Sequence, residues 1–301
     1  MATHTALSDH PAPRSPGRRM AAFFFHHPRA GLAALLAGPV GWLAVAYLGS
    51  LALLFVAALW SLDPFTAEIV HEYSLDNFRL LWESEVYRQI AARTIFIAAA
   101  VTLTDALLAL PIAFYMAKVA SRRTRALLVV LILMPLWTSY LVKVYAWRIM
   151  LAENGFVNWL LEPFGLEGPG YGNVAVWLVM SYLWLPYMVL PVYAGFERIP
   201  DSLLEASSDL GGKAWTTLRR VVLPIVFPAI VAGSIFTFSL TLGDFITPQL
   251  LSSTQFIANV VYVNVGVANN LPLAAAFATV PVVVMIAYLL VARRLGAFES
   301  L

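Results

Sequence analysis

The chain contains six stretches of about 20 or more mostly apolar residues, separated by more polar connections. A helix of about 20 apolar residues is long enough to cross the hydrocarbon core of a bilayer. The composition agrees, because 60% of the 301 residues are hydrophobic and only 12% are charged, more apolar surface than a soluble core can bury. We therefore expect an all-α integral membrane protein with six transmembrane helices. Their expected positions are residues 32–60, 94–117, 126–150, 174–196, 221–246 and 271–292.

Residues 1–31 precede the first apolar stretch and are rich in Pro, Ser, Arg and His. Such a segment has too few apolar residues to bury, so we expect a disordered tail. The apolar stretch that follows is too long for the core of a signal peptide and precedes five others, which predicts a retained helix. The chain has no cysteine, so a disulfide, a thiol nucleophile and a cysteine-based metal site are excluded.

Lys and Arg side chains are concentrated in alternate connections between the apolar stretches. Cytoplasmic connections of membrane proteins carry an excess of Lys and Arg. The opposite connections are mainly acidic, and residues 247–270 carry no charge. Both termini and the connection around residues 198–222 are therefore predicted to be cytoplasmic. The basic residues are Arg14, Arg18, Arg19, Arg29, Lys118, Arg122, Arg123, Arg125, Arg198, Lys213, Arg219, Arg220, Arg293 and Arg294.

One predicted cytoplasmic connection, SLLEASSDLGGKAWTTLRRVVLP, has the pattern of a soluble helical hairpin. Ser202 and Glu205 match the Ser-x-x-Glu capping box that begins a helix. Gly211 and Gly212 predict the end of that helix, where a left-handed residue is favoured. A second short helix is expected from Lys213 onward, before the fifth transmembrane helix begins.

Three interpretations of this connection are open. Glu205 could serve only as a cap. A DNA-binding helix-turn-helix has a similar outline, but tethering to membrane helices at both ends and a net charge near zero disfavour nucleic acid as a partner. The third interpretation is an ordered cytoplasmic platform that presents an apolar and acidic surface to another protein.

The same connection resembles the E-A-A-x3-G-x9-I-x-L-P signature of the membrane subunits of binding-protein-dependent ABC importers. The signature is matched with its spacing, and Ser207 and Val221 stand where it has Ala and Ile. The resemblance implies a type I ABC importer permease fold over residues 32–301, with coupling helices at about 198–222 that dock on an ATPase. The residues implied in that contact are Glu205, Ala206, Ser207, Asp209, Gly211 and Gly212.

The chain itself carries no phosphate-binding loop. Gly212-Lys213 is followed by Ala214, and no glycine precedes Gly212 by five residues, so the G-x4-G-K-[ST] pattern fails. We therefore expect a non-catalytic subunit without a cofactor or metal of its own. The resemblance implies that ATP and Mg are bound by a pair of partner ATPase subunits. It also implies a second, homologous permease, an external substrate-binding protein and the lipid of a bacterial inner membrane as partners.

Two further stretches resemble the spermidine and putrescine importer permeases, in particular the first of the two permease subunits. They are LILMPLWTSYLVKVYAWRIMLAENGFVNWLL and GDFITPQLLSSTQFIANVVYVNVG. The resemblance implies that the solute is a small organic cation of the polyamine type. Related importers carry other small nitrogenous solutes, such as opines or amino acids, and this alternative stays open.

Two carboxylates lie within the predicted transmembrane helices, Asp105 and Asp244. A charged group at the bilayer centre costs about 2.5–3.5 kcal/mol on insertion scales, so each one is a candidate for the solute pathway. A buried hydrogen bond for Asp105, or helix capping for Asp244, is the structural alternative. Aromatic rings could stack on a cation, although packing and interfacial anchoring are common uses for them. The other candidate pathway residues are Thr241, Trp137, Tyr140 and Trp184.

The sequence disfavours two other classes of protein. A gradient-driven transporter is expected to show internal repeats with broken helices at matching positions, and no convincing repeat is visible. An intramembrane hydrolase is disfavoured, because His71-Glu72 is not followed by the second His of an H-E-x-x-H motif and no G-x-S-x-G occurs.

Overall fold

The computed structural model describes residues 25–294, in two units that divide between residues 54 and 55. The first unit contains helix α2 (Pro28–Leu43), a π-helical turn (Ala44–Leu48) and most of α3 (Gly49–Ala57). Together they form an apolar helix that is long enough to cross a membrane. The helix begins a few residues before the predicted position. Residues 1–24 of the predicted tail lie outside the described residues.

The second unit begins with a small polar cap. Strands β1 (Ser61–Leu62) and β2 (Ile69–Val70) pair antiparallel, with Ser61 opposite Val70. Helix α4 (Asp76–Glu83) follows. The Asn77 amide donates to the carbonyls of Ala58 (3.0 Å) and Trp60 (2.7 Å), which ties α4 to the chain that precedes the hairpin.

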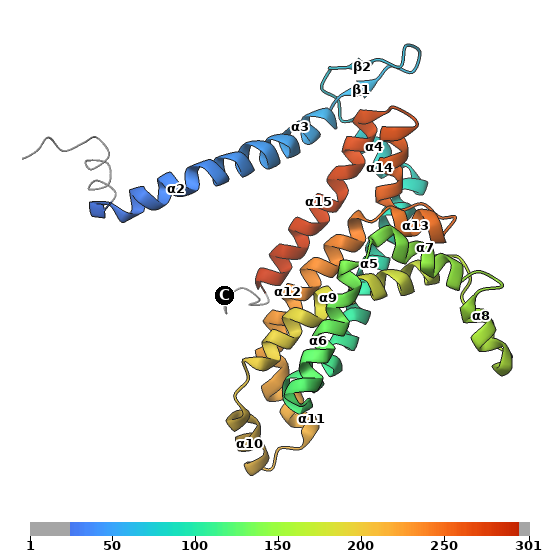
Figure 1. Ribbon diagram of the computed structural model, residues 1–301. Coiled ribbons are helices and arrows are strands. Elements are labelled where there is room, and N and C mark those ends of the chain that lie inside the picture. The colour runs from blue at the N-terminus through green and yellow to red at the C-terminus, as the bar shows by residue number, and fades with distance from the viewer. Residues whose placement is uncertain (1–24, 295–301) are drawn as a thin grey trace, which may run out of the picture. The chain divides into compact units, whose positions relative to one another are not determined.

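Three long helices form the centre of the second unit (Figure 1). They are α5 (Glu85–Phe114, extended by a π-helical turn at Tyr115–Val119), α9 (Asn173–Glu197) and α12 (Leu223–Gly243). One half of their core contains Val101, Val179 and Leu183, and the other half contains Ala113, Met188 and Phe196. Small residues allow the close approach, because a Cβ on Gly195 would lie 2.7 Å from the Cβ of Ala229.

The last part of the chain packs beside α12. It consists of α13 (Ile246–Leu251), α14 (Ile257–Gly266) and α15 (Leu271–Arg294). The hydroxyls of Ser234 on α12 and Tyr288 on α15 are 2.5 Å apart, and the Phe238 and Tyr288 rings stack at 4.8 Å. Figure 1 shows α15 running alongside α12.

The third predicted span is not one continuous helix. It divides into α6 (Arg122–Trp137) and α7 (Tyr140–Met150), which meet at 95°. Thr138 has extended backbone angles, and the carbonyl of Pro135 accepts bonds from the Thr138 hydroxyl (2.8 Å) and the Lys143 ammonium (2.9 Å). Side chains therefore satisfy the helix end that the break exposes. A short hairpin with α8 (Phe156–Leu161) and a 3₁₀ turn (Glu162–Phe164) follows.

Five described helices are long and apolar enough to cross a membrane, and the number is six if the bent pair is counted as one span. This number confirms the predicted all-α fold class. The second span begins at Glu85 instead of residue 94, because the helix extends past its apolar part through a turn that contains Arg88 and Arg93. Hydropathy therefore predicts the apolar part of a helix, but it does not predict the residue at which the helix begins or ends.

Candidate functional site

Asp244 lies at the break between α12 and α13. Helix α12 ends at Gly243, and Asp244 has extended backbone angles (φ −80°, ψ 120°). Its Oδ1 accepts the backbone N–H groups of Ile246 (2.9 Å) and Thr247 (3.2 Å), as the side chain of a helix N-cap does. The prediction of a fifth span that continues to residue 246 is therefore wrong at this end, because the carboxylate caps a new helix.

The other oxygen of the Asp244 carboxylate binds two hydroxyl groups. Oδ2 accepts the Tyr140 hydroxyl at 2.5 Å and the Thr247 hydroxyl at 2.6 Å. Among the described residues, no Lys or Arg forms an ion pair with Asp244. Neutral donors thus hold the carboxylate in place without cancelling its negative charge.

A pocket of about 330 Å³ opens beside this carboxylate. It is formed by α7, α9, α12 and the turn before α13, so four segments that are distant in sequence contribute to it. Three of the predicted pathway residues, Tyr140, Trp184 and Asp244, meet here. The complete lining is Tyr140, Trp184, Ser239, Leu240, Gly243, Asp244, Phe245 and Ile246.

A row of aromatic rings leads from the pocket onto α9 and α12. The Tyr140 and Trp184 rings stack with centroids 5.8 Å apart and an interplanar angle of 10°. Trp184 then meets Tyr187 at 6.1 Å, and Tyr187 meets Phe236 at 6.5 Å. Aromatic faces attract cations, so the row continues the attraction that the carboxylate exerts on a positive group.

The other three predicted pathway residues lie elsewhere. Trp137 ends α6 and is 86% exposed, whereas Thr241 is buried and its hydroxyl donates to the Thr237 carbonyl. Asp105 is fully buried on α5, between Ala98 and Ala109 on the same face. None of the three lines the pocket. The pathway role of Asp105 stays a prediction.

The surroundings of Asp105 are unusual among the described residues. Both of its carboxylate oxygens are buried without a hydrogen-bond partner. Ser181 Oγ and Trp184 Nε1, on α9, are buried and unpaired as well. The indole of Trp177 donates to the Thr104 hydroxyl at 3.1 Å, which places this part of α9 against the turn of α5 that contains Asp105. Unpaired polar atoms in a core cost free energy, which makes this cluster a candidate for a functional role.

Thr247, Tyr187 and Phe236 were not identified from the sequence. Thr247 carried a local signal, because Asp-x-x-Thr followed by Pro248 is typical of a helix start. Tyr187 and Phe236 carried none, since their contribution depends on the packing of α9 against α12.

The predicted coupling loop forms helix α10 (Asp201–Asp209) and a turn at two glycines. Gly211 has a φ of +76°, the left-handed conformation that the sequence predicted. The N–H groups of Gly211 and Gly212 bind the carbonyls of Ser208 and Ser207, each at 2.8 Å, in a Schellman motif. A Cβ on Gly212 would lie 2.6 Å from the Ser207 carbonyl oxygen, so Gly212 has no room for a side chain, whereas Gly211 is favoured by its left-handed backbone.

Two details of this loop differ from the prediction. The capping box is wrong, because α10 begins at Asp201 after Pro200 and no side chain caps it, which leaves Ser202 inside the first turn. The second helix is not separate. Helix α11 (Ala214–Thr217) continues through a π-helical turn (Leu218–Val222) into α12 as one helix over residues 214–243. The wider π turn accommodates Pro224, which has no N–H to donate.

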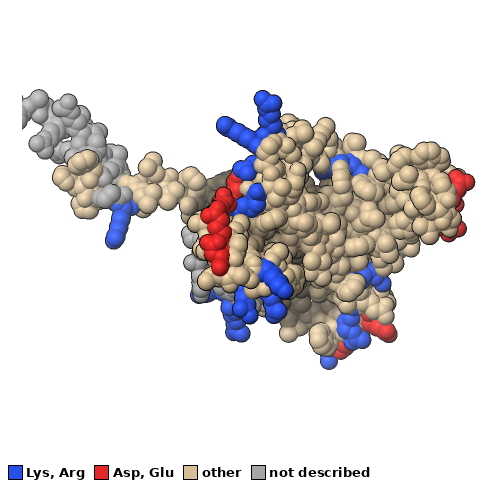
Figure 2. Space-filling view, turned by 90° about the horizontal axis from the view of Figure 1, so that it is seen from below, with Lys and Arg blue, Asp and Glu red and all other residues tan. Residues whose placement is uncertain are grey.

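The loop presents a mixed surface at its end of the bundle. Leu210 is 89% exposed and Trp215 is 68% exposed. Asp201, Glu205 and Asp209 recur every four residues and are exposed along one face of α10. Figure 2 views this end and shows a row of acidic side chains with basic side chains grouped around it. Exposed apolar groups beside charged ones are typical of a protein-binding surface.

Apolar helices long enough to cross a membrane, a bent helix pair, a pocket beside a carboxylate and an ordered polar loop are features expected of a membrane transport subunit. The chain belongs to the family described as "Binding-protein-dependent transport system inner membrane component", whose model matches residues 109–297. It is 44% identical, over 96% of its length and 98% of the relative, to the inner membrane ABC transporter permease protein YdcU of Escherichia coli strain K12. It is 30% identical to the spermidine/putrescine transport system permease protein PotB of the same strain, over 85% of this chain and 94% of that one.

The fold matches solved ABC importers. A chain of a bacterial ABC transporter that imports the acidic polysaccharide alginate superimposes with a TM-score of 0.71 at 18% identity, over 92% of this chain and 99% of that one. A second structure of a bacterial alginate transporter, in complex with an alginate pentasaccharide-bound periplasmic protein, gives 0.72 at 18% identity, over 89% and 95% of the two chains. The chain is therefore a multi-pass inner membrane permease subunit of the ABC importer type.

Proposed function

We propose that this subunit forms part of the pathway for a small organic cation of the polyamine type. The observation that carries the proposal is the pocket at the Asp244 carboxylate. Its charge is held by neutral donors, and the rings of Tyr140 and Trp184 flank it. A positive group that enters the pocket meets an uncompensated negative charge and aromatic faces together.

This arrangement suits a pathway that releases its solute better than a site that retains it. The carboxylate already accepts four hydrogen bonds from Tyr140, Ile246 and Thr247, so it can attract a passing cation without the strong pairing of a free carboxylate. A pathway must bind a solute weakly enough to release it. Beyond Trp184, the rings of the aromatic row offer further weak attraction to a cation at successive positions.

Among these relatives, the support for the solute class comes from the name of one permease. One relative is a spermidine/putrescine permease, whereas the structural neighbours belong to importers of an acidic polysaccharide. One fold thus serves solutes of opposite charge, and the residues of the site must decide between them. The acidic, aromatic pocket favours a cation over the alternative of an opine or an amino acid.

The energy source and the partners are part of the same proposal. Helix α10 and the start of α11 would contact an ATPase subunit through their acidic and apolar surface, with ATP and Mg bound by that partner. A pair of ATPase subunits, a second permease and an external binding protein would complete the transporter. Both termini and the α10 loop would then face the cytoplasm, as the distribution of Lys and Arg predicts.

The test is Asp244→Asn in the complete transporter, reconstituted with its binding protein. The amide keeps the shape, and the hydroxyls of Tyr140 and Thr247 can turn to accept from it, so the fold should survive. Loss of the charge should lower the uptake of spermidine and putrescine on the order of tenfold. Glu167→Gln removes an exposed carboxylate outside the pocket and should leave uptake unchanged. Polyamine uptake by Asp244→Asn at the normal rate, or transport of anions only, would refute the cation pathway.

A further inference from the structure

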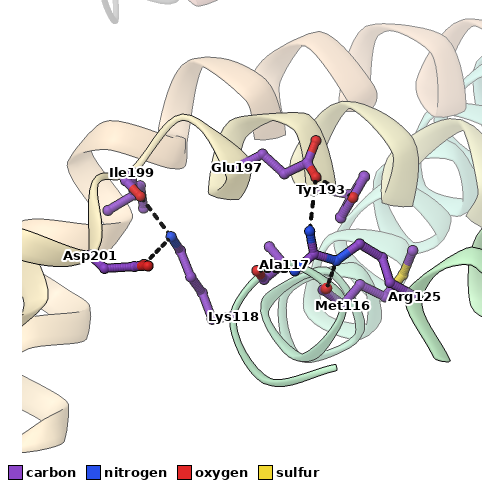
Figure 3. Close-up of polar contacts among 8 residues, drawn as sticks. All are labelled: Met116, Ala117, Lys118, Arg125, Tyr193, Glu197, Ile199 and Asp201. Atoms are coloured by element: carbon purple, nitrogen blue, oxygen red, sulfur yellow. Dashed lines mark hydrogen bonds and ion pairs between the residues drawn. The ribbon is translucent and has the colours of Figure 1, made fainter. Parts of the chain in front are cut away.

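Two basic side chains connect α5, α6, α9 and α10 at the α10 end of the bundle (Figure 3). Lys118 lies in the π-helical turn that ends α5. Its ammonium donates to the Ile199 carbonyl at 2.6 Å and to the Asp201 carboxylate at 2.7 Å. The first contact is with the residues between α9 and α10, and the second is with the first turn of α10 itself.

The two bonds of Lys118 differ in strength. Asp201 is 79% exposed, so water and salt screen that ion pair and it contributes little. The Lys118 side chain is only 12% exposed, and Ile199 is buried. Its carbonyl lies just past the last turn of α9, where no helical N–H remains to bind it. The ammonium therefore binds a carbonyl just beyond the end of α9, and this bond is the stronger anchor.

Arg125, near the start of α6, makes a second set of connections, to α5 and α9. Its Nε and Nη2 donate to the carbonyls of Met116 and Ala117, each at 2.9 Å, and so cap the end of α5. Its Nη1 lies 3.6 Å from the carboxylate of Glu197 on α9, which also accepts the Tyr193 hydroxyl. Figure 3 shows the guanidinium between the two helices. Arg125 thus links α6 to both α5 and α9 at this end of the bundle.

Helix α10 has few other attachments. None of its residues is buried. Leu204 packs on the core, and the Ser207 hydroxyl contacts the Thr217 hydroxyl at 2.8 Å within the loop. Among the described residues, Lys118 is the one side chain outside residues 198–222 that hydrogen-bonds to α10. A displacement of α10 can reach the bundle through the backbone to α9 and through the packing of Leu204, and Lys118 adds a direct polar connection to α5.

We propose that Lys118 is a positioning residue for energy coupling, which fastens the coupling loop to α5 so that α5, α9 and α10 move as one body. The inference rests on the proposed function and adds a residue outside the signature loop. Its physical basis is that a rigid connection passes on a domain rotation, whereas a loose one absorbs it. Helix α5 packs on α9 and α12, which line the Asp244 pocket, so the connection leads from the loop to the pocket.

The first experiment compares Lys118→Met, Lys118→Arg, Asp201→Asn and Arg123→Met in the purified, reconstituted transporter. The readout is the number of solute molecules imported per ATP hydrolysed, with co-purification of the ATPase measured separately. Lys118→Met should lower this ratio about tenfold, and Asp201→Asn less than about twofold, because the carbonyl bond persists. Lys118→Arg should restore most of the coupling. Arg123 is exposed and has no bonded partner among the described residues, so Arg123→Met should behave as wild type.

A normal ratio in Lys118→Met would overturn the inference, as would equal losses in Lys118→Met and Arg123→Met. Failure of the wild-type chain to bind an ATPase would instead refute the proposed function, so the two failures are distinguishable.

The second experiment measures motion directly. The chain has no cysteine, so Val119→Cys and Ser208→Cys provide a unique pair for spin labels, once partner cysteines are removed. The distance between the labels should be the same in the resting and the nucleotide-trapped transporter. Adding Lys118→Met should broaden the distribution. A change of about 5 Å between the two states of the wild-type background, the scale of a one-turn shift, would contradict the single-body proposal.

Discussion

The Tyr140 hydroxyl donates a 2.5 Å hydrogen bond to the Asp244 carboxylate, across 104 residues of sequence. The bond joins the first turn of α7, just after the bend of the third span, to the break after α12. The bend therefore has a function in this arrangement, because it places Tyr140 at the pocket.

Tyr140→Phe removes this donor and keeps the ring. The buried carboxylate then loses one of its charge-assisted hydrogen bonds, so we expect a loss of about 1.5–3 kcal/mol in the stability of the folded subunit. Polyamine uptake should also fall. Tyr145→Phe is the matched control, because Tyr145 is half exposed and its hydroxyl has no bonded partner among the described residues. Thermal unfolding of the assembled transporter and uptake measure the two effects, and equal behaviour of the two variants would contradict the role of Tyr140.

Lys143 should be required for the bend. Its ammonium binds the carbonyl of Pro135 at the exposed end of α6. Lys143→Met leaves that carbonyl with the hydroxyl and the backbone N–H of Thr138, and we expect a loss of about 1–3 kcal/mol in stability, together with lower uptake. Lys143→Arg keeps a donor and should retain most of both. Unchanged unfolding and uptake in Lys143→Met would show that the bend is held by other contacts.

Asp105→Asn tests the unpaired carboxylate in the core. An unpartnered buried charge is costly, so the neutral amide should raise the thermal unfolding temperature of the transporter. If Asp105 serves the pathway, uptake should fall in the same variant, as expected when a strained group is kept for function. A less stable Asp105→Asn subunit would mean that the carboxylate has a partner. Greater stability with normal uptake would exclude the pathway role.

Gly211 gives a graded test of the turn after α10. Its φ of +76° suits Gly and is tolerated by Asn, but it is unfavourable for a β-branched residue. Gly211→Val should therefore distort the loop and reduce the number of solute molecules imported per ATP, whereas Gly211→Asn should retain most of the coupling. Membrane insertion should be normal in both variants. Full coupling in Gly211→Val would show that energy transfer does not depend on the geometry of this turn.

Local patterns in the sequence were sufficient for the order of the elements. The apolar stretches predicted the order and approximate positions of five membrane-spanning helices and of the bent pair, because a helix that crosses a bilayer must be apolar over about 20 residues. Gly211 and Gly212 predicted the end of α10, because the left-handed turn needs glycine at that position. Both inferences depend only on neighbours along the chain.

Tertiary structure decided which side chains meet. The bend before Tyr140, the cap formed by Asp244 and the stacking of Trp184 on Tyr140 bring together residues that no local period relates. Lys118 reaches Ile199 across 81 residues for the same reason. Hydropathy reports how apolar a segment is, but the partner of a polar group depends on how the helices pack and where each one ends. A buried carboxylate such as Asp105 could thus be noticed in the sequence, whereas its separation from the pocket became evident only in the folded chain.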